Sequence, residues 1–232
     1  MKTAIKTGFA ALLLLLAISC KKENVGIQSN FDKAGTAAQA PITGANDLNA
    51  EAVRIGTQVW KKKDLATIYY RNGDRIPYVK DADKWSKLTT GAWCWYNNDP
   101  RYGKLYNWFA VNDPRGLAPE GWHVPSEIEW TKLTKFLGGY IVAGGKMKET
   151  GSINWKDPNA DATNSSGFTA LPGGSRYYLG EFFDAGGYGY WWSSTEAAPN
   201  AAWYRYLTYF YGAISGTTEY KLNGFSVRCL HD

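Results

Sequence analysis

The stretch Pro125-Ser126-Glu127-Ile128-Glu129-Trp130-Thr131-Lys132-Leu133-Thr134-Lys135-Phe136-Leu137-Gly138-Gly139 contains the clearest helix signal in the sequence. Ser126 with Glu129 three residues later is typical of a capping box, in which each residue satisfies a free backbone N–H of the other. The apolar stripe of this helix is predicted to comprise Ile128, Leu133, Phe136 and Leu137, flanked by Trp130. The glycine pair at 138 and 139 is expected to end it.

Short strands and long loops are expected around this helix. Alternating apolar residues predict an opening strand over 53–59, and a weaker signal predicts a short helix over 81–87. Four further strands are predicted over residues 105–111, 189–193, 202–209 and 224–230, separated by stretches rich in Gly, Asn, Ser and Pro. Few helices and short strands with extensive loops favour an α+β fold over a doubly wound sheet or a repeat array.

The first 19 residues have the layout of a secretory signal peptide. Lys2 and Lys6 precede an apolar run over 8–18 that is too short to span a bilayer. The run ends in Ala17-Ile18-Ser19-Cys20, which resembles a lipobox, so Cys20 is the expected lipidation site. Two or three acyl chains such as palmitate would hold the protein on a membrane almost permanently. An ordinary secretory signal that happens to end near a cysteine is the alternative.

Residues 20–50 are predicted to form a lipidated, flexible stalk, and residues 51–232 a single folded domain. The stalk is rich in Ala, Gly, Asn, Thr and Ser and shows neither helical nor strand periodicity. Lys21, Lys22 and Glu23 partly resemble the surface-export signal of some outer-membrane lipoproteins. The expected location is therefore the outer membrane with a lipid anchor, and the sequence leaves open which side the domain faces.

The charge pattern gives no indication of nucleic-acid binding. Removal of Lys2 and Lys6 with the leader would lower the formal charge from +5 to +3. The remaining basic residues are interleaved with Asp and Glu, and no run of Lys and Arg is long enough to follow a phosphate backbone.

Several motifs together resemble one known family, the Fibrobacter succinogenes major paralogous domain. The resemblance covers about residues 53–232 and is carried by motifs that occur in the family's order: Gly103-Lys104-Leu105-Tyr106-Asn107-Trp108, Gly121-Trp122-His123-Val124-Pro125-Ser126 with Glu129-Trp130, Gly167-Phe168-Thr169-Ala170-Leu171-Pro172-Gly173-Gly174, Tyr190-Trp191-Trp192-Ser193-Ser194-Thr195 and Gly224-Phe225-Ser226-Val227-Arg228-Cys229. This resemblance implies a C-type lectin-like fold close to the formylglycine-generating enzymes, with first and last strands paired in a small sheet.

The resemblance also implies a disulfide. In many C-type lectin-like domains a cysteine of the last strand is bridged to an earlier element, and Cys94 is the one candidate partner for Cys229 once Cys20 is lipidated. Such a bridge would contribute roughly 4 to 5 kcal/mol in the chain-entropy model. Two buried free thiols are the alternative, because sequence does not reveal the geometry that a disulfide needs.

No catalytic centre is expected, so the protein is predicted not to be an enzyme. The formylglycine-generating relatives bind copper with two closely spaced cysteines, whereas Cys229 stands alone, and iron-dependent relatives need three histidines where this chain has two. His123 is interpreted as structural, since Ser126 is used by the helix cap. Glu127 and Glu129 would point to different faces of their helix, which argues against a joint acid and base role.

No cofactor or metal is expected, although calcium is left open. Sugar-binding C-type lectins hold calcium with Glu-Pro-Asn and Trp-Asn-Asp triplets, of which residues 196–200 and 111–113 keep only parts. Oxygen ligands alternate over 157–161 as at the start of an EF-hand loop, but Ala162 replaces the turn glycine and Phe168 the bidentate glutamate.

Aromatic residues supply the remaining functional hypothesis. Eleven Trp and sixteen Tyr provide flat rings with polar edges of the kind that contact sugars and protein surfaces. Trp108, Trp122, Trp130 and one of Trp191 and Trp192 are assigned to packing. The candidate ligand-binding residues lie in two predicted loops: Tyr177, Tyr178 and Tyr188 in the first, and Tyr209, Tyr211 and Tyr220 in the last. For each of them the alternative is a half-exposed tyrosine that only covers backbone.

The favoured function is a non-catalytic, membrane-tethered binding module for a glycan or a surface protein. A structural or accessory component of a cell-surface assembly is the second hypothesis. An enzyme of unknown type on a formylglycine-generating-enzyme-like fold is the third, and it would require a deep polar pocket with a perturbed carboxylate or histidine.

Overall fold

The computed structural model describes residues 51–232 of the chain. The predicted leader, Cys20 and stalk lie outside these described residues. The chain divides into two units, residues 1–40 and 41–232, and every described residue belongs to the second.

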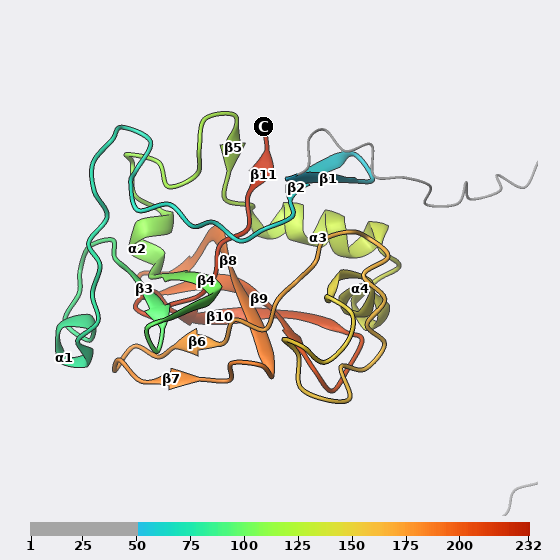
Figure 1. Cartoon of the computed structure of the whole chain (residues 1–232). Coiled ribbons are helices and arrows are strands. Elements are labelled where there is room, and N and C mark those ends of the chain that lie inside the picture. Colours follow the sequence, from blue (N-terminus) through green and yellow to red (C-terminus); the bar gives the residue numbers. More distant parts are fainter. Residues whose placement is uncertain (1–50) are drawn as a thin grey trace, which may run out of the picture. The chain divides into compact units, whose positions relative to one another are not determined.

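Four small antiparallel sheets and four helices make up the described part of the chain, an α+β arrangement (Figure 1). In chain order the elements are β1 (Ala52–Ile55), β2 (Gln58–Lys61), α1 (Ala82–Trp85), β3 (Trp93–Tyr96), β4 (Asp99–Tyr106), α2 (Trp108–Val111), β5 (Trp122–His123), α3 (Glu127–Phe136), α4 (Tyr140–Met147), β6 (Ser175–Arg176), β7 (Phe182–Phe183), β8 (Tyr188–Ala198), β9 (Ala201–Thr208), β10 (Ile214–Tyr220) and β11 (Leu230–His231). The predicted fold class is confirmed at this level.

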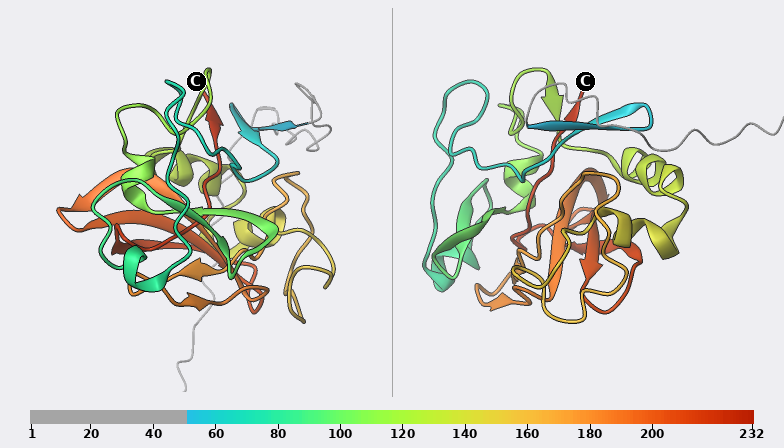
Figure 2. Two further views of the ribbon diagram at one scale, coloured as in Figure 1. Left: turned by 60° about the vertical axis from the view of Figure 1, so that its left-hand side comes forward. Right: turned by 45° about the vertical axis from the view of Figure 1, so that its right-hand side comes forward.

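The first and last strands lie in one sheet with the order β1-β2-β11-β5. Leu230 of β11 is paired with Trp60 of β2 on one side and with His123 of β5 on the other. The expected opening strand over 53–59 is instead a hairpin, because Gly56 adopts a φ of 61° and reverses the chain between β1 and β2. In both views of Figure 2, as in Figure 1, this sheet lies at the end of the domain opposite to the β6–β7 hairpin.

The sheet with the most residues has three long strands in the order β10-β9-β8, and we call it the largest sheet. It separates two hydrophobic clusters. Successive residues of a strand point to opposite faces, and Trp191 and Trp192 of β8 accordingly enter different clusters. Both indoles are fully buried. The prediction that only one of this pair is used for packing is therefore wrong, because the sheet is covered on both faces.

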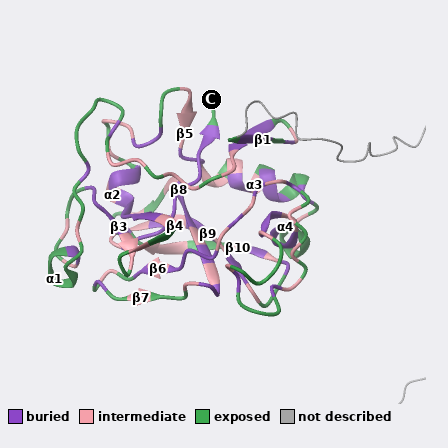
Figure 3. Ribbon diagram, viewed as in Figure 1, coloured by how far each residue is buried: buried purple, intermediate pink, exposed green. Residues whose placement is uncertain are grey.

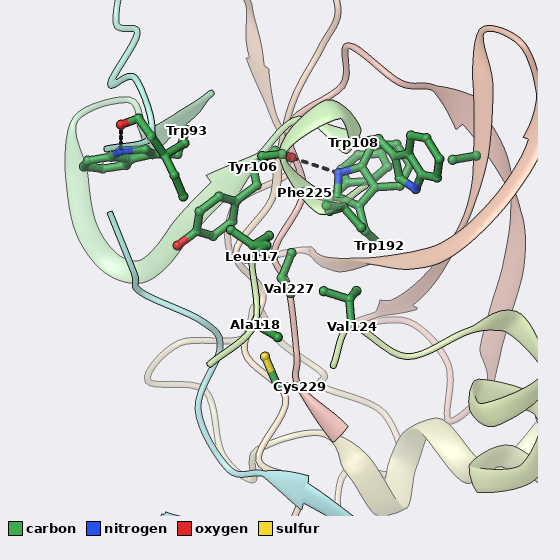
Figure 4. Close-up of a cluster of buried hydrophobic side chains, with 14 of the residues drawn as sticks. Trp93, Tyr106, Trp108, Leu117, Ala118, Val124, Trp192, Phe225, Val227 and Cys229 are labelled. Carbon is green, nitrogen blue, oxygen red and sulfur yellow. Dashed lines mark hydrogen bonds between the residues drawn. The ribbon is translucent and has the colours of Figure 1, made fainter. Parts of the chain in front are cut away.

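Figure 4 shows the cluster on the Trp192 side, where Trp192 Nε1 donates a hydrogen bond to the carbonyl oxygen of Tyr106 at 2.8 Å. The other cluster includes Trp130 and Leu133 from α3 together with Met147 from α4. Among the described residues a smaller third cluster surrounds Trp85 and Cys94. Figure 3 shows the buried residues of the sheet between more exposed loops and helix faces.

The predicted helix is confirmed as α3, with both hydrogen bonds of the Ser126–Glu129 capping box present. Its buried stripe differs from the prediction. Trp130, Leu133 and Leu137 are buried, whereas Ile128 is 81% exposed and Phe136 53% exposed. The helix therefore packs through the face centred on Trp130, and the apolar residues on its other side are left on the surface.

Two further elements differ from the sequence-based expectation. The strand predicted over 105–111 ends at Tyr106, because the side chain of Asn107 accepts a hydrogen bond from the Ala110 amide and begins the helical turn α2. The glycine pair at 138 and 139 ends α3 as predicted, but a second helix, α4, begins directly after it. The short predicted helix over 81–87 is confirmed as α1.

Candidate ligand-binding cleft

A cleft of about 290 Å³ lies between the β6–β7 hairpin and the largest sheet. We call it the tyrosine cleft, and it is lined by Ser175, Tyr177, Phe183, Asp184, Tyr190, Tyr204, Glu219, Asn223 and Phe225. Its apolar walls with a few convergent polar groups are typical of small-ligand sites.

The alternation of strand residues builds the wall on the sheet side. Tyr190 of β8 is paired with Tyr206 of β9, and Trp192 with Tyr204, so these four rings share one face of the sheet. The ring of Phe225 stacks on Tyr190 with centroids 5.2 Å apart and lies 4.8 Å from that of Tyr204. Packing against Phe225 therefore fixes Tyr190 and Tyr204, the two lining tyrosines of this wall.

The rim of the cleft includes three tyrosines, of which Tyr178 contacts the other two. The ring of Tyr178 lies 4.4 Å from that of Tyr177 and 4.9 Å from that of Tyr220. Tyr177 is 37% exposed and Tyr220 is 46% exposed, so their rings are accessible from solvent. Phe183 of β7 completes this side and meets Tyr177 edge to face.

Two carboxylates provide the charge of the cleft. Asp184 accepts a hydrogen bond from the hydroxyl of Tyr190 at 2.8 Å. Burial, together with this negatively charged neighbour, holds the pKa of Tyr190 well above its ordinary range, so the phenol stays protonated and remains the donor. Glu219 Oε2 accepts from the Tyr220 amide at 3.2 Å and from Asn223 Nδ2 at 3.3 Å.

Asn223 is 3% exposed, and its Oδ1 has no hydrogen-bond partner within residues 51–232. Its Nδ2 donates to the carboxylate of Glu219, and this contact fixes the amide orientation because the reverse would place two acceptors together. A buried acceptor left without a donor costs about 1–3 kcal/mol. A ligand that supplies a donor at this position would remove that cost.

Of the six tyrosines predicted to bind a ligand, three lie at the cleft and three lie beyond it. Tyr177 lines the cleft, while Tyr178 and Tyr220 complete its rim. Tyr188 stacks on Tyr190 at 5.8 Å with nearly parallel rings and extends the aromatic surface beyond the cleft. Burial, Asp184 and the phenols of Tyr209, Tyr206 and Tyr211 raise the pKa of Tyr188.

Tyr209 and Tyr211 therefore belong to the far end of this aromatic surface and do not line the cleft. Sequence reasoning missed the wall residues Tyr190 and Tyr204, although the i, i+2 spacing of Tyr188 with Tyr190 and of Tyr204 with Tyr206 was a usable signal. Asp184 and Glu219 were missed because isolated acidic residues carry no local signal.

The predicted disulfide between Cys94 and Cys229 is not formed. Both residues are buried free thiols, and they lie in different hydrophobic clusters. Cys94 belongs to the cluster around Trp85, whereas Cys229 packs in the cluster that contains Leu117, Ala118 and Val227, where Figure 4 draws its sulfur. The alternative of two buried thiols is the one that the structure supports.

His123 lies between two carboxylates, with Nε2 2.9 Å from Glu129 Oε1 and Nδ1 2.7 Å from Asp232 Oδ1. Ser126 donates its hydroxyl to Glu129 and makes no hydrogen bond to the histidine. The arrangement links β5, α3 and the C-terminus and does not form a nucleophile–base pair. Among residues 51–232 no group of three or more His, Cys, Asp or Glu side chains is placed to hold a metal ion.

Larger clefts occur elsewhere but have less suitable linings. One of about 520 Å³ lies beside Phe136 and the β1–β2 turn, and another of about 420 Å³ lies over Asp64 and Arg228. In the second, Asp64 and Arg228 are already paired with each other at 2.7 Å. The tyrosine cleft differs because Asn223 Oδ1 has no hydrogen-bond partner, and Asp184 and Glu219 have no cationic partner, among residues 51–232.

The fold and the cleft define an α+β domain with an aromatic surface site. The model of the Fibrobacter succinogenes major domain matches residues 53–231, and the chain therefore belongs to this family. No curated protein and no solved structure matches the chain. In the described part of the chain no helix is long and apolar enough to cross a membrane.

Proposed function

We propose that this chain is a non-catalytic, lipid-anchored cell-envelope protein whose C-type lectin-like domain binds a glycan in the tyrosine cleft. The observation that carries the proposal is the cleft itself, which combines aromatic walls with unpaired polar groups at one end of the domain. Sugar rings have apolar faces and hydroxyl edges, and this combination suits aromatic faces bordered by hydrogen-bonding groups.

Supporting the lectin-like fold is the sheet that holds β1, β2 and β11, since it brings the two ends of the domain together as that fold requires. Supporting the anchor are the lipobox-like residues 17–20 and the apolar run before them. Supporting a binding role over catalysis is the use of His123 in a contact that links strand, helix and C-terminus.

The test is glycan-array screening of residues 41–232 followed by titration calorimetry on each glycan that binds. Tyr177→Ala and Phe183→Ala remove exposed rings of the cleft and are expected to weaken binding at least tenfold. Tyr211→Ala removes a ring that is 65% exposed but lies outside the cleft, and it serves as the matched control. The proposal fails if no glycan binds, or if the control weakens binding as much as the cleft variants.

A second candidate function is an accessory role in a cell-surface assembly, and one specific observation favours it. Helix α4 begins with Tyr140, Ile141 and Val142, which are 66%, 64% and 45% exposed, close in sequence to the exposed Phe136 of α3. Adjacent exposed apolar residues often mark protein interfaces. Sedimentation of residues 41–232 before and after Ile141→Lys tests this role, since an assembly formed through α4 would dissociate.

A further inference from the structure

We propose that the tyrosine cleft selects saccharides that carry a protonated amino group, such as hexosamine units whose nitrogen is not acylated. This inference rests on the proposed glycan-binding function and names the ligand class. The feature that carries it is the juxtaposition of two unpaired carboxylates and a buried unpaired acceptor, Asn223 Oδ1, within one aromatic cleft.

The carboxylates of the cleft lack the cationic partners that several other carboxylates of this domain possess. Asp64 is paired with Arg228, Asp113 with Arg115, Glu127 with Arg205 and Glu196 with Lys221. Asp184 and Glu219 form no ion pair with any Lys, Arg or His of residues 51–232. They are the charged residues that line the cleft, so the site attracts cations and repels anions.

Hydrogen-bond inventory points the same way. One oxygen of Asp184 and one of Glu219 accept the bonds described above, and the second oxygen of each accepts none from the described residues. Asn223 Oδ1 adds a third unused acceptor. An ammonium group has three donors and no acceptor, whereas an acetamido group brings one N–H and an additional carbonyl oxygen. The protonated amine therefore fits this surplus of acceptors better.

The aromatic walls strengthen this selectivity. Tyr190, Tyr204 and Phe225 lie with ring centroids 4.8–6.0 Å apart along one side of the cleft. Aromatic faces attract cations by about 0.5–1 kcal/mol at exposed sites and by about 2 kcal/mol or more where water is excluded. The exposed rings of Tyr177 and Phe183 in the same cleft accept the apolar side of a sugar ring, so one site serves both parts of an aminosugar.

The buried cation next to Ser175 in the sequence does not neutralise the cleft. Arg176 follows the lining residue Ser175, but its guanidinium donates to the backbone carbonyls of Val79, Lys80 and Gly180. It is also held over the rings of Trp85 and Phe182. Because the guanidinium of Arg176 is hydrogen-bonded to these carbonyls, it does not pair with Asp184 or Glu219. Both carboxylates therefore stay available to a ligand.

Titration calorimetry on residues 41–232 tests the inference with three tetramers of equal length: β-1,4-linked glucosamine, N-acetylglucosamine and glucose. At a pH that keeps the amine protonated, the glucosamine tetramer is expected to bind at least tenfold more tightly than the others, which corresponds to about 1.4 kcal/mol. Glu219→Gln and Asp184→Asn are expected to abolish this preference.

These variants are suited to the test because they keep shape while removing charge. Asp184 has a φ of 73°, a conformation that asparagine also adopts readily, so Asp184→Asn does not strain the turn. Glu181→Gln is the matched control, because it removes the same charge from an exposed position of the β6–β7 hairpin that does not line the cleft. The control is expected to retain the full preference.

Three outcomes would overturn the inference. Equal affinity for the three tetramers, with no effect of Glu219→Gln, removes the selectivity but leaves the proposed glycan binding intact if Tyr177→Ala still weakens binding. Equal affinity for spermidine shows that charge alone holds the ligand without the sugar ring. Failure of every tetramer and of the glycan array removes the proposed function and this inference with it.

Discussion

Arg228 Nε lies 2.7 Å from Asp64 Oδ1, and both side chains are buried, with 1% and 5% of their area exposed. The indole of Trp191 donates to the same oxygen of Asp64 at 2.8 Å, while Arg228 also donates to the backbone carbonyls of Lys61 and Lys62. Asp64 follows β2, Arg228 precedes β11 and Trp191 lies in β8. These contacts therefore join both segments to the largest sheet.

Breaking this ion pair from one side should strongly destabilise the domain. Arg228→Met leaves the Asp64 charge buried without a cationic partner, and we expect the free energy of unfolding to fall by about 3–5 kcal/mol. Urea unfolding followed by tryptophan fluorescence measures the loss. The double variant with Asp64→Leu should lose less than the sum of the two single changes, because no uncompensated charge remains. Additive losses would contradict a direct interaction.

The two buried cysteines should be unreactive in the native domain. Burial raises the pKa of each thiol to about 12, and the thiolate is the species that reacts. We expect Ellman's reagent to label no thiol of residues 41–232 under native conditions and both after unfolding in urea. Labelling of the native domain would contradict the burial of the thiols. If no thiol reacts after unfolding without reductant, the two cysteines form a disulfide after all.

The contacts of His123 should make stability depend on pH in a defined window. Burial lowers the pKa of His123, but its hydrogen bonds to Asp232 and Glu129 outweigh this effect and raise the pKa above the ordinary 6.5. Burial raises the pKa of Glu129, but its bonds to Ser126 and His123 outweigh that effect and lower the pKa below the ordinary 4.5.

The signs follow from linkage. The His123 contribution is complete below about 6.5 and is lost as pH rises through the folded-state value. The Glu129 contribution is present above about 4.5 and is lost as pH falls through its folded-state value. The stability that His123→Gln removes should thus be greatest between about pH 4.5 and 6.5, and should be about 1 kcal/mol or less because the pair is one-third exposed. Thermal unfolding across pH checks this, with His231→Gln as the control; a pH-independent loss would contradict it.

Lys148 should be essential to the stability of the segment after β9. Its fully buried ammonium donates to the carbonyl oxygens of Ala160, Thr208 and Tyr211 at 2.7–3.0 Å. Lys148→Met removes these donors, and at about 1–3 kcal/mol for each unpaired buried group we expect a loss of at least about 2 kcal/mol in urea unfolding. The exposed Lys135→Met is the control, and equal losses for both would refute the role.

The proposed anchor makes a prediction outside the described residues. Replacement of Cys20 by Ala removes the thiol that would be acylated, so the variant should neither incorporate labelled palmitate nor partition into the detergent phase of Triton X-114. The unaltered chain should do both. Detergent partition that persists in the variant would show that another feature attaches the protein to membranes.

Local sequence patterns predicted the elements whose signals are complete within a few residues. Ser126 and Glu129 identify the start of α3 because the capping box involves only backbone groups of one turn. The strands over 189–193 and 202–209 were predicted between stretches rich in Gly, Asn, Ser and Pro, and they correspond to β8 and β9.

Elements that depend on distant packing were not predictable in this way. Helix α4 contains Gly144, where an added Cβ would lie 2.3 Å from the carbonyl oxygen of Ala213, so glycine is required by a neighbour 69 positions away. Glycine lowers helix propensity, and the sequence pattern therefore pointed away from a helix. Likewise residues 105–111 are apolar or aromatic except for Asn107, and this one polar residue decides where the strand ends and the helix begins.

The candidate site was predicted only in part, because it too depends on contacts between distant parts of the chain. Tyr177, Tyr178 and Tyr220 were selected as loop aromatics and lie at the cleft, whereas Tyr209 and Tyr211 have the same local character and lie beyond it. What distinguishes the first group is the contact of Tyr178 with both Tyr177 and Tyr220, which joins residues far apart in the sequence.

The placement of β1 and the β6–β7 hairpin at opposite ends of the domain bears on how a tethered molecule would meet its ligand (Figure 2). The described chain starts beside β1, so a lipid upstream of it would pull on the end remote from Tyr177 and Phe183. The binding surface would then point outward from the bilayer, and force on a captured polymer would run through the length of the domain to the membrane.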